Sequence, residues 1–205
     1  MKLNSLNEDI KNNIKDYIIF KPKNKDELQK AVDIWCIDKE KALNYHGHIS
    51  TWNTSLINDM SKLFMYQEFN QDISQWNVSN VTDMSYMFCE ALSFDQDISQ
   101  WNMSNVTDMH SMFSKAEAFN KDISQWNVSN VTNMKSMFSG ASSFNQDISK
   151  WNVSNVTDMG YMFSEASLFN KDISLWNLSN VYYMNYMFYG ASSFNQDISQ
   201  WNVSN

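Results

Sequence analysis

The sequence predicts a repeat solenoid, a rod of stacked short coils, with an α-helical cap at its N-terminal end. The first observation behind this prediction is the spacing of the tryptophans, which recur 24 residues apart once and 25 residues apart thereafter. They are Trp52, Trp76, Trp101, Trp126, Trp151, Trp176 and Trp201. The second observation is that one apolar pattern returns around each of them, and the third is that residues 1–47 lack it. A fixed period of this length is typical of chains in which each repeat buries its apolar face against its neighbours.

We therefore expect two parts: a helical N-terminal cap, residues 1–47, and a solenoid of about six and a half repeats, residues 48–205. The end of a solenoid exposes an apolar cross-section, and the cap would cover it. Within the cap, residues 5–20 place apolar side chains at helical spacing, and Pro22 marks a break.

A second helix is predicted to begin near Asn24, because a capping side chain is followed there by acidic residues. Its apolar stripe consists of Leu28, Ala31, Val32 and Trp35. A third, short helix is expected over Lys39–Tyr45, with Asp38 as its cap and Gly47 just beyond its end. The sequence thus predicts a compact helical module ahead of the repeats.

One full coil, residues 97–119, shows how each repeat is expected to fold. Ile98, Trp101, Met103 and Val106 have the spacing of a leucine-rich-repeat core, which predicts a short strand at Trp101–Met103 with Asn102 facing outward. The following apolar residues are spaced three and four apart, which predicts a short helix. Its expected N-cap is Asn105 or Thr107, and Gly140 and Gly190 stand where the equivalent helices would end. Stacking would give a parallel sheet and an internal column of tryptophans. The predicted fold class is therefore a leucine-rich-repeat-like solenoid.

The repeat DISxWNVSNVTDMxxMFxxAxxFNQ resembles the repeat of BspA-like bacterial surface proteins, a mycoplasma-type family of unknown function. The resemblance covers about Ile49 to Asn205, and the best copies are Asp72–Phe94, Asp122–Phe144 and Asp147–Phe169. It implies a leucine-rich-repeat-like solenoid with roles in adhesion or protein–protein contact, and it carries over no catalytic residues. The segment ELQKAVDIWCIDKEKALNYHGHISTWNTS is similar to a cap module found ahead of such repeats in large DNA viruses and protists.

The charge balance disfavours two classes of partner. The formal net charge is −8, the chain has no arginine, and residues 48–205 carry six Lys against fifteen Asp and Glu, or −9. Nucleic-acid binders need a basic face, usually with arginine, and anionic membrane surfaces attract basic segments. We therefore expect neither a nucleic-acid partner nor a membrane partner.

An aspartate recurs just ahead of each coil, at Asp72, Asp97, Asp122, Asp147, Asp172 and Asp197. Stacked carboxylates would bind a cation such as Ca²⁺ between them, or each would accept backbone N–H bonds in its own turn. We favour the turn, because the glycine-rich spacing of calcium-binding β-rolls is absent. His46, His48 and His110 supply no third metal ligand, and Cys36 and Cys89 are expected to be free thiols.

The repeat also generates eleven N-x-[S/T] glycosylation sequons, from Asn53 to Asn202. We interpret them as a by-product of a repeat that needs asparagine for turns and for contacts between coils. No general acid–base pair, nucleophile–base set or glycine-rich phosphate loop stands out. We therefore predict that the protein is not an enzyme and that it holds no cofactor or metal ion.

Two surfaces are candidates for binding a protein partner. The first is the outward face of the predicted strands, whose amides offer hydrogen bonds without strong charge: Gln75, Asn77, Gln100, Asn102, Gln125, Asn127, Lys150 and Asn152. The second is a group of tyrosines, Tyr182, Tyr186 and Tyr189, on one face of a predicted helix, with Tyr161 in the Tyr186 position of the preceding coil. Clustered tyrosine is favoured at interfaces, although it also simply covers apolar surface.

The last residues are WNVSN, part-way through a coil, so Trp201 and Val203 are expected to form an open edge that could pair with a second copy as a homodimer. The main hypothesis is a non-enzymatic scaffold for protein–protein interaction, and the alternatives are self-assembly through that edge or surface adhesion. Because the N-terminus has no export signal, we expect an intracellular or virion-associated protein, at the cell surface only if a leader was removed.

Overall fold

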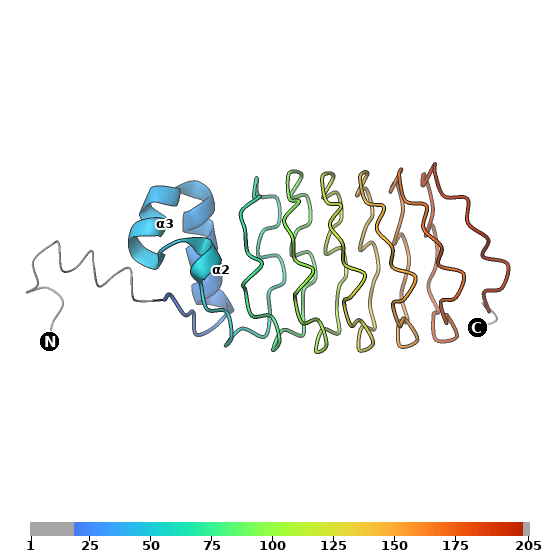
Figure 1. The fold of residues 1–205 in the computed structure, drawn as a ribbon, viewed down its shortest axis with the longest axis horizontal. Coiled ribbons are helices and arrows are strands. Elements are labelled where there is room, and N and C mark those ends of the chain that lie inside the picture. Colours follow the sequence, from blue (N-terminus) through green and yellow to red (C-terminus); the bar gives the residue numbers. More distant parts are fainter. Residues whose placement is uncertain (1–18, 203–205) are drawn as a thin grey trace, which may run out of the picture.

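The computed structural model describes residues 19–202, and the helical pattern of residues 5–18 lies outside this range. The molecule is elongated, with helices at one end and successive repeats side by side along the long axis (Figure 1). The helices are α2, Lys25–Ile37, and α3, Lys39–His46, followed by a 3-10 turn, η2, at Ile49–Thr51. Repeating units of about 25 residues occupy the rest of the described chain.

The two cap helices form where the sequence predicts them, because their ends are capped locally. The side chain of Asn24 accepts a hydrogen bond from the backbone N–H of Glu27 (3.0 Å), and that of Asp38 accepts one from Lys41 (3.0 Å). Gly47 ends α3 with a left-handed φ of 70°. The predicted stripe is confirmed, since the buried residues of α2 are Leu28, Ala31, Val32 and Trp35.

The cap shares one apolar core with the repeats. Trp35 packs edge-on against Trp52 of the first coil, with ring centroids 6.0 Å apart, and Phe20 does the same at 5.1 Å. Lys25 of α2 forms an ion pair with Asp59 (2.7 Å). The buried cluster continues from Leu28 to Met187. The helices therefore cover the apolar face that the first coil would otherwise expose, while the boundary at residue 47 stays a prediction.

The predicted helix of each coil is wrong. Residues 106–116 form consecutive turns, and Ser111 and Lys115 adopt left-handed φ values of 52° and 56° that interrupt any α-helix. Alternate backbone N–H groups leave the coil altogether: those of Met109 and Phe113 donate to the carbonyls of Asn133 and Met137 in the next coil, at 3.0 and 2.9 Å. The cap predictions for Asn105 and Thr107 fail with the helix, and Gly140 and Gly190 end turns instead.

The predicted strand at Trp101–Met103 is also wrong. A turn closed by a backbone hydrogen bond lies on each side of it. One bond runs from Trp101 N–H to Ile98 O (3.1 Å), and the other from Val106 N–H to Met103 O (3.0 Å). The N–H of Trp101 and the C=O of Met103 are thus used within the coil, and no ladder forms at these residues. Parallel pairing occurs one turn later, as isolated bridges such as Asp83 with Asp108.

Phenylalanines, more than tryptophans, build the continuous aromatic columns of the core. The rings of Phe113 and Phe138 stack 5.7 Å apart, and those of Phe138 and Phe163 stack 5.8 Å apart. A second column runs through Phe119 and Phe144, at 6.2 Å. The tryptophan column is found only in part, with stacked rings at Trp52–Trp76 (6.2 Å) and Trp126–Trp151 (6.4 Å). Offset stacks at these distances are favourable beyond the area that they bury.

From Trp76 to Trp176, each tryptophan of the repeats has a hydrogen-bond partner in the preceding coil. The indole N–H of Trp126 donates to the carbonyl of Ile98 at 3.1 Å, and that of Trp151 donates to Ile123 at 3.1 Å. A buried indole without such a partner would cost about 1–3 kcal/mol. The I-x-x-W spacing therefore fixes the register between neighbouring coils as well as filling the core.

Candidate functional site

The predicted amide face exists as an exposed row along the stack, but its polar atoms are engaged locally. Asn77, Asn102, Asn127 and Asn152 are exposed, and the Oδ1 of each accepts the backbone N–H of the serine two residues later, at 3.0–3.2 Å. The amide of Gln100 is also exposed and donates to Ser99 Oγ at 3.3 Å. The oxygen atoms of these asparagines therefore stabilise turns, and only the remaining amide donors are available to a partner.

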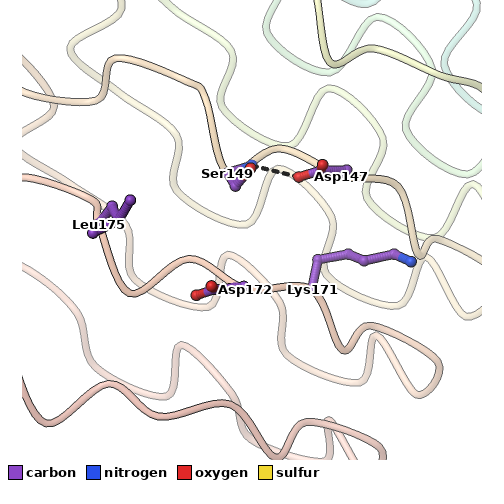
Figure 2. Close-up of a pocket in the computed structure, with 5 residues that line it drawn as sticks. All are labelled: Asp147, Ser149, Lys171, Asp172 and Leu175. Atoms are coloured by element: carbon purple, nitrogen blue, oxygen red, sulfur yellow. Dashed lines mark hydrogen bonds between the residues drawn. The ribbon is translucent and has the colours of Figure 1, made fainter.

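The aspartate row makes the turns that the sequence predicts. The carboxylate of Asp147 accepts the backbone N–H of Ser149 at 3.0 Å, and Asp172 does the same with Ser174 at 2.9 Å. Hydrogen bonds from the hydroxyl and the backbone N–H of Ser149 hold the pKa of Asp147 below its usual value. Figure 2 shows this bond beside Lys171 and Leu175, which line the same hollow. In residues 19–202, no group of three or more His, Cys, Asp or Glu is placed to hold a metal ion.

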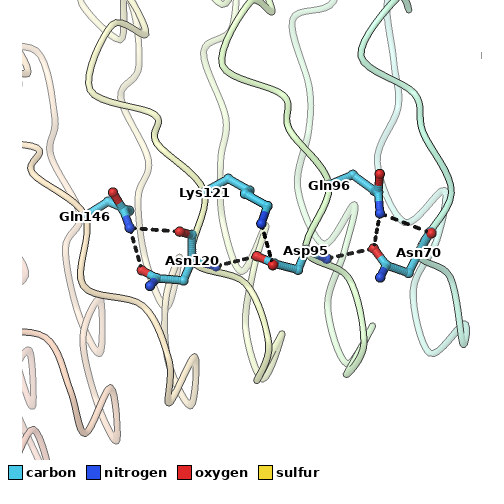
Figure 3. Close-up of polar contacts among 6 residues, drawn as sticks. All are labelled: Asn70, Asp95, Gln96, Asn120, Lys121 and Gln146. Atoms are coloured by element: carbon cyan, nitrogen blue, oxygen red, sulfur yellow. Dashed lines mark hydrogen bonds and ion pairs between the residues drawn. The ribbon is translucent and has the colours of Figure 1, made fainter.

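A second polar ladder, which sequence reasoning missed, runs from coil to coil two residues ahead of the aspartate row (Figure 3). Asn70 Oδ1 accepts the backbone N–H of Asp95 at 3.0 Å, and Asp95 Oδ1 accepts that of Asn120 at 3.0 Å. Gln96 adds a bond to Asn70 Oδ1 (2.7 Å), and Lys121 pairs with Asp95 (2.6 Å). The F-N-Q/K-D spacing was the available signal. The ladder ties coil to coil and is structural.

The structure separates the sequon asparagines into two groups. The amide N–H of Asn105 donates to the carbonyl of Ser79 at 2.7 Å, and Asn130 repeats this bond to Ser104 at 2.7 Å. Members of this group bridge coils, as the sequence interpretation expects. The other group, Asn77 and its equivalents, makes turns inside one coil. Both groups thus have structural reasons to be asparagine.

The histidines pack against aromatic rings, and the cysteines form no disulfide. His46 lies 4.2 Å from the ring of Phe20, and His48 lies 5.1 Å from that of Trp35, both measured between ring centroids. His110 lies beside Tyr86, with Nε2 3.3 Å from the phenol oxygen, and burial lowers its pKa. Both cysteines are free, and burial raises the pKa of Cys36 to about 11.

The tyrosine group is the largest exposed aromatic feature of the repeats. Tyr182, Tyr183, Tyr186 and Tyr189 are 68%, 62%, 59% and 62% exposed. No helix carries them, but contacts still connect three rings: Tyr186 stacks on Tyr161 with centroids 5.1 Å apart and meets Tyr189 edge-on at 6.1 Å. Tyr183, which sequence reasoning did not include, is exposed at a position where other repeats have Asp or Asn. We call Tyr161 with these four residues the tyrosine surface.

The predicted assembly edge is described only at Trp201, since Val203 lies outside the described residues. Trp201 is partly buried; its indole N–H donates to Ile173 O at 3.1 Å, and its ring stacks with Phe188 at 6.2 Å. Its environment is thus the same as that of the other tryptophans on the side that faces the preceding coil.

The repeats that carry these surfaces match a known family model twice, over residues 37–142 and 121–205. The model is described as "Mycoplasma protein of unknown function, DUF285". The chain belongs to this family. No curated protein and no solved structure matches the chain. No helix within residues 19–202 of this DUF285 protein is long and apolar enough to cross a membrane. The function of this family member therefore has to be argued from its own surfaces.

Proposed function

We propose that this protein is a non-enzymatic, leucine-rich-repeat-like solenoid scaffold that binds another protein through the tyrosine surface. The observation that carries the proposal is the exposure of Tyr182, Tyr183, Tyr186 and Tyr189 at 59–68% in one repeat. Tyrosine gives a large contact area at a low cost in conformational entropy, which is why interfaces favour it. The resemblance of the repeat to BspA-like surface proteins supports the same class of function.

The earlier repeats supply a comparison inside the chain. At the positions of Tyr182 and Tyr183 the preceding repeat has Thr157 and Asp158, and at the position of Tyr189 it has Ser164. The fold therefore does not require tyrosine at these positions. Three tyrosines in place of the small or polar residues of the preceding repeat add apolar area to the surface without adding a contact that the core needs.

The experiment compares the protein with a variant that restores the earlier residues: Tyr182→Thr, Tyr183→Asp, Tyr186→Ser and Tyr189→Ser. A library of random peptides displayed on phage is selected on the natural protein. We expect the enriched peptides to bind the variant about ten-fold or more weakly, because truncating interface aromatic residues commonly costs more than 1 kcal/mol each. Equal binding to both proteins would refute the assignment.

A matched control changes the amide face instead, with Gln75→Ser, Gln100→Ser and Gln125→Ser. The amides of Gln100 and Gln125 donate to the adjacent serine hydroxyls at 3.3 and 3.1 Å, so little of the fold depends on them. Peptides that lose binding to this control, and keep it for the tyrosine variant, would move the interface to the amide face. Circular dichroism and a thermal melt check that both variants stay folded.

A further inference from the structure

Two columns of left-handed residues run along one side of the stack, at equivalent positions of successive repeats. The first column contains Lys62, Tyr86, Ser111, Ser136, Tyr161 and Tyr186, and the second contains Tyr66, Glu90, Lys115, Gly140, Glu165 and Gly190. Since the fold fixes the backbone at each position, a change of side chain there changes the surface and leaves the coil intact.

Near the cap, these columns hold cations that the chain itself supplies. The ammonium of Lys62 lies 5.7 Å from the ring centroid of Tyr86, within the range of a cation–π interaction. The ammonium of Lys115 lies 2.8 Å from the carboxylate of Glu90. A tyrosine in the first column and a glutamate in the second are therefore both placed to receive an ammonium group.

In the later coils, tyrosine recurs in the first column and glutamate in the second, but neither column has a lysine there. Tyr186 follows Tyr161 in the first column, and the position that follows Glu165 in the second column is Gly190. A Cβ atom on Gly190 would lie 3.2 Å from Cγ of Glu165, so the glutamate lies over the glycine. Glu165 is exposed, and none of the ion pairs within residues 19–202 includes it.

Three connected tyrosine rings and the exposed side chain of Glu165 thus lie on two neighbouring coils. The backbone N–H of Glu165 donates to the carbonyl of Tyr189 at 2.6 Å, and Tyr189 meets Tyr186 edge-on. Residues 158–202 carry four Asp or Glu against one Lys. A second copy of this face would be repelled by its like charge, whereas a basic segment would be attracted.

We propose that Tyr161, Tyr186, Tyr189 and Glu165 form a receptor for a lysine or arginine side chain in a basic segment of the partner protein. The inference rests on the proposed function, because it names the chemistry of the partner at the tyrosine surface. The cation lies against the face of the Tyr186 ring that Tyr161 leaves open and pairs with Glu165. In the earlier coils two separate lysines make these two kinds of contact, Lys62 with Tyr86 and Lys115 with Glu90.

The probe is a fluorescent hexalysine peptide, titrated with the protein at about 0.1 M salt and followed by fluorescence anisotropy. We expect Tyr186→Ser and Glu165→Gln each to weaken binding about three-fold. Tyr186→Ser is safe for the fold, because Ser111 and Ser136 occupy the same column. At higher salt, the effect of Glu165→Gln shrinks and that of Tyr186→Ser remains, since screening acts on exposed ion pairs.

The matched control is Glu68→Gln, which removes the same charge from the first coil. That position is four repeats away, roughly 19 Å at the spacing of paired strands and beyond the Debye length. If Glu68→Gln and Glu165→Gln weaken binding equally, the peptide senses only the net charge and the proposal fails. It also fails if Tyr186→Ser has no effect. Peptides selected by phage display that still distinguish the tyrosine variant would then leave the proposed function standing.

Discussion

Truncation of the central phenylalanine column should destabilise the protein more than truncation of the same position near its end. Phe138 is fully buried, and its ring stacks on Phe113 at 5.7 Å, on Phe163 at 5.8 Å and on Phe144 at 3.8 Å. Phe→Ala changes in cores cost about 3–5 kcal/mol. Since domains are stable by about 5–15 kcal/mol, Phe138→Ala removes a large share of the free energy of unfolding.

Phe188 provides the matched comparison. It occupies the same position of its repeat but is only partly buried, so we expect Phe188→Ala to cost about half as much. Because coils interact mainly with their neighbours, Phe138→Ala should also uncouple the two halves of the stack and lower the m-value in urea. Unfolding followed by tryptophan fluorescence and by far-UV circular dichroism measures both quantities. If Phe138→Ala and Phe188→Ala lower the free energy of unfolding by amounts that agree within about 0.5 kcal/mol, with unchanged m-values, this account of the core is refuted.

Three further predictions concern the polar and backbone features of the repeat. Asn130→Ala should lower the free energy of unfolding by about 1 kcal/mol, because it removes the bond to Ser104 O, whereas Gln125→Ala should change it little in urea titrations. Ser136→Gly should raise the melting temperature, because glycine relieves a left-handed φ of 54° at a net gain of about 0.5–1 kcal/mol. Burial lowers the pKa of His110 in the folded state, so the unfolded chain binds more protons. The resulting stabilisation is present above about pH 6.5 and is lost as the pH falls through the folded pKa, so His110→Ser should flatten unfolding free energies measured between pH 7.5 and 5.

The sequence was sufficient to predict the repeat unit, the cap helices α2 and α3 and nearly all of the core. The period of the tryptophans reports directly on which residues share an environment, and the caps Asn24 and Asp38 are local features that a short segment determines. These properties depend on side-chain type and spacing. They can therefore be predicted without knowing the path of the backbone.

The path of the backbone within each coil could not be predicted in the same way. Apolar residues three and four apart fit a helix, but they also fit successive turns that send alternate N–H groups to the next coil. The residues that decide between the two, such as Ser111 and Lys115, are not glycines, so the sequence carries no mark of their left-handed φ values. The stacking of neighbours stabilises a conformation that the local sequence does not favour.

The candidate site was predicted in part, because four of its tyrosines were named while Glu165 and Tyr183 were not. An acidic side chain is common on any surface, and only the structure shows that Glu165 lies over Gly190 beside Tyr189. The helix that was expected to align Tyr182 with Tyr186 is absent, and the ring of Tyr186 stacks instead on Tyr161 of the preceding coil.

Because the coils are nearly identical, a comparison of equivalent positions within the chain distinguishes structural from functional residues. Ile148, Trp151 and Phe163 sit where every complete coil has the same residue type, because each meets the same neighbours in the coil before and after it. Surface positions have no such requirement, so a departure there costs little and changes what the surface can bind. Leu175 is the clearest case outside the tyrosine surface: it is 88% exposed at a position that is Thr in the first coil and otherwise Gln or Lys. Leu175 and the tyrosine surface both lie in the later coils, so partner recognition is expected to concentrate there and the coils nearer the cap to act as a rigid support.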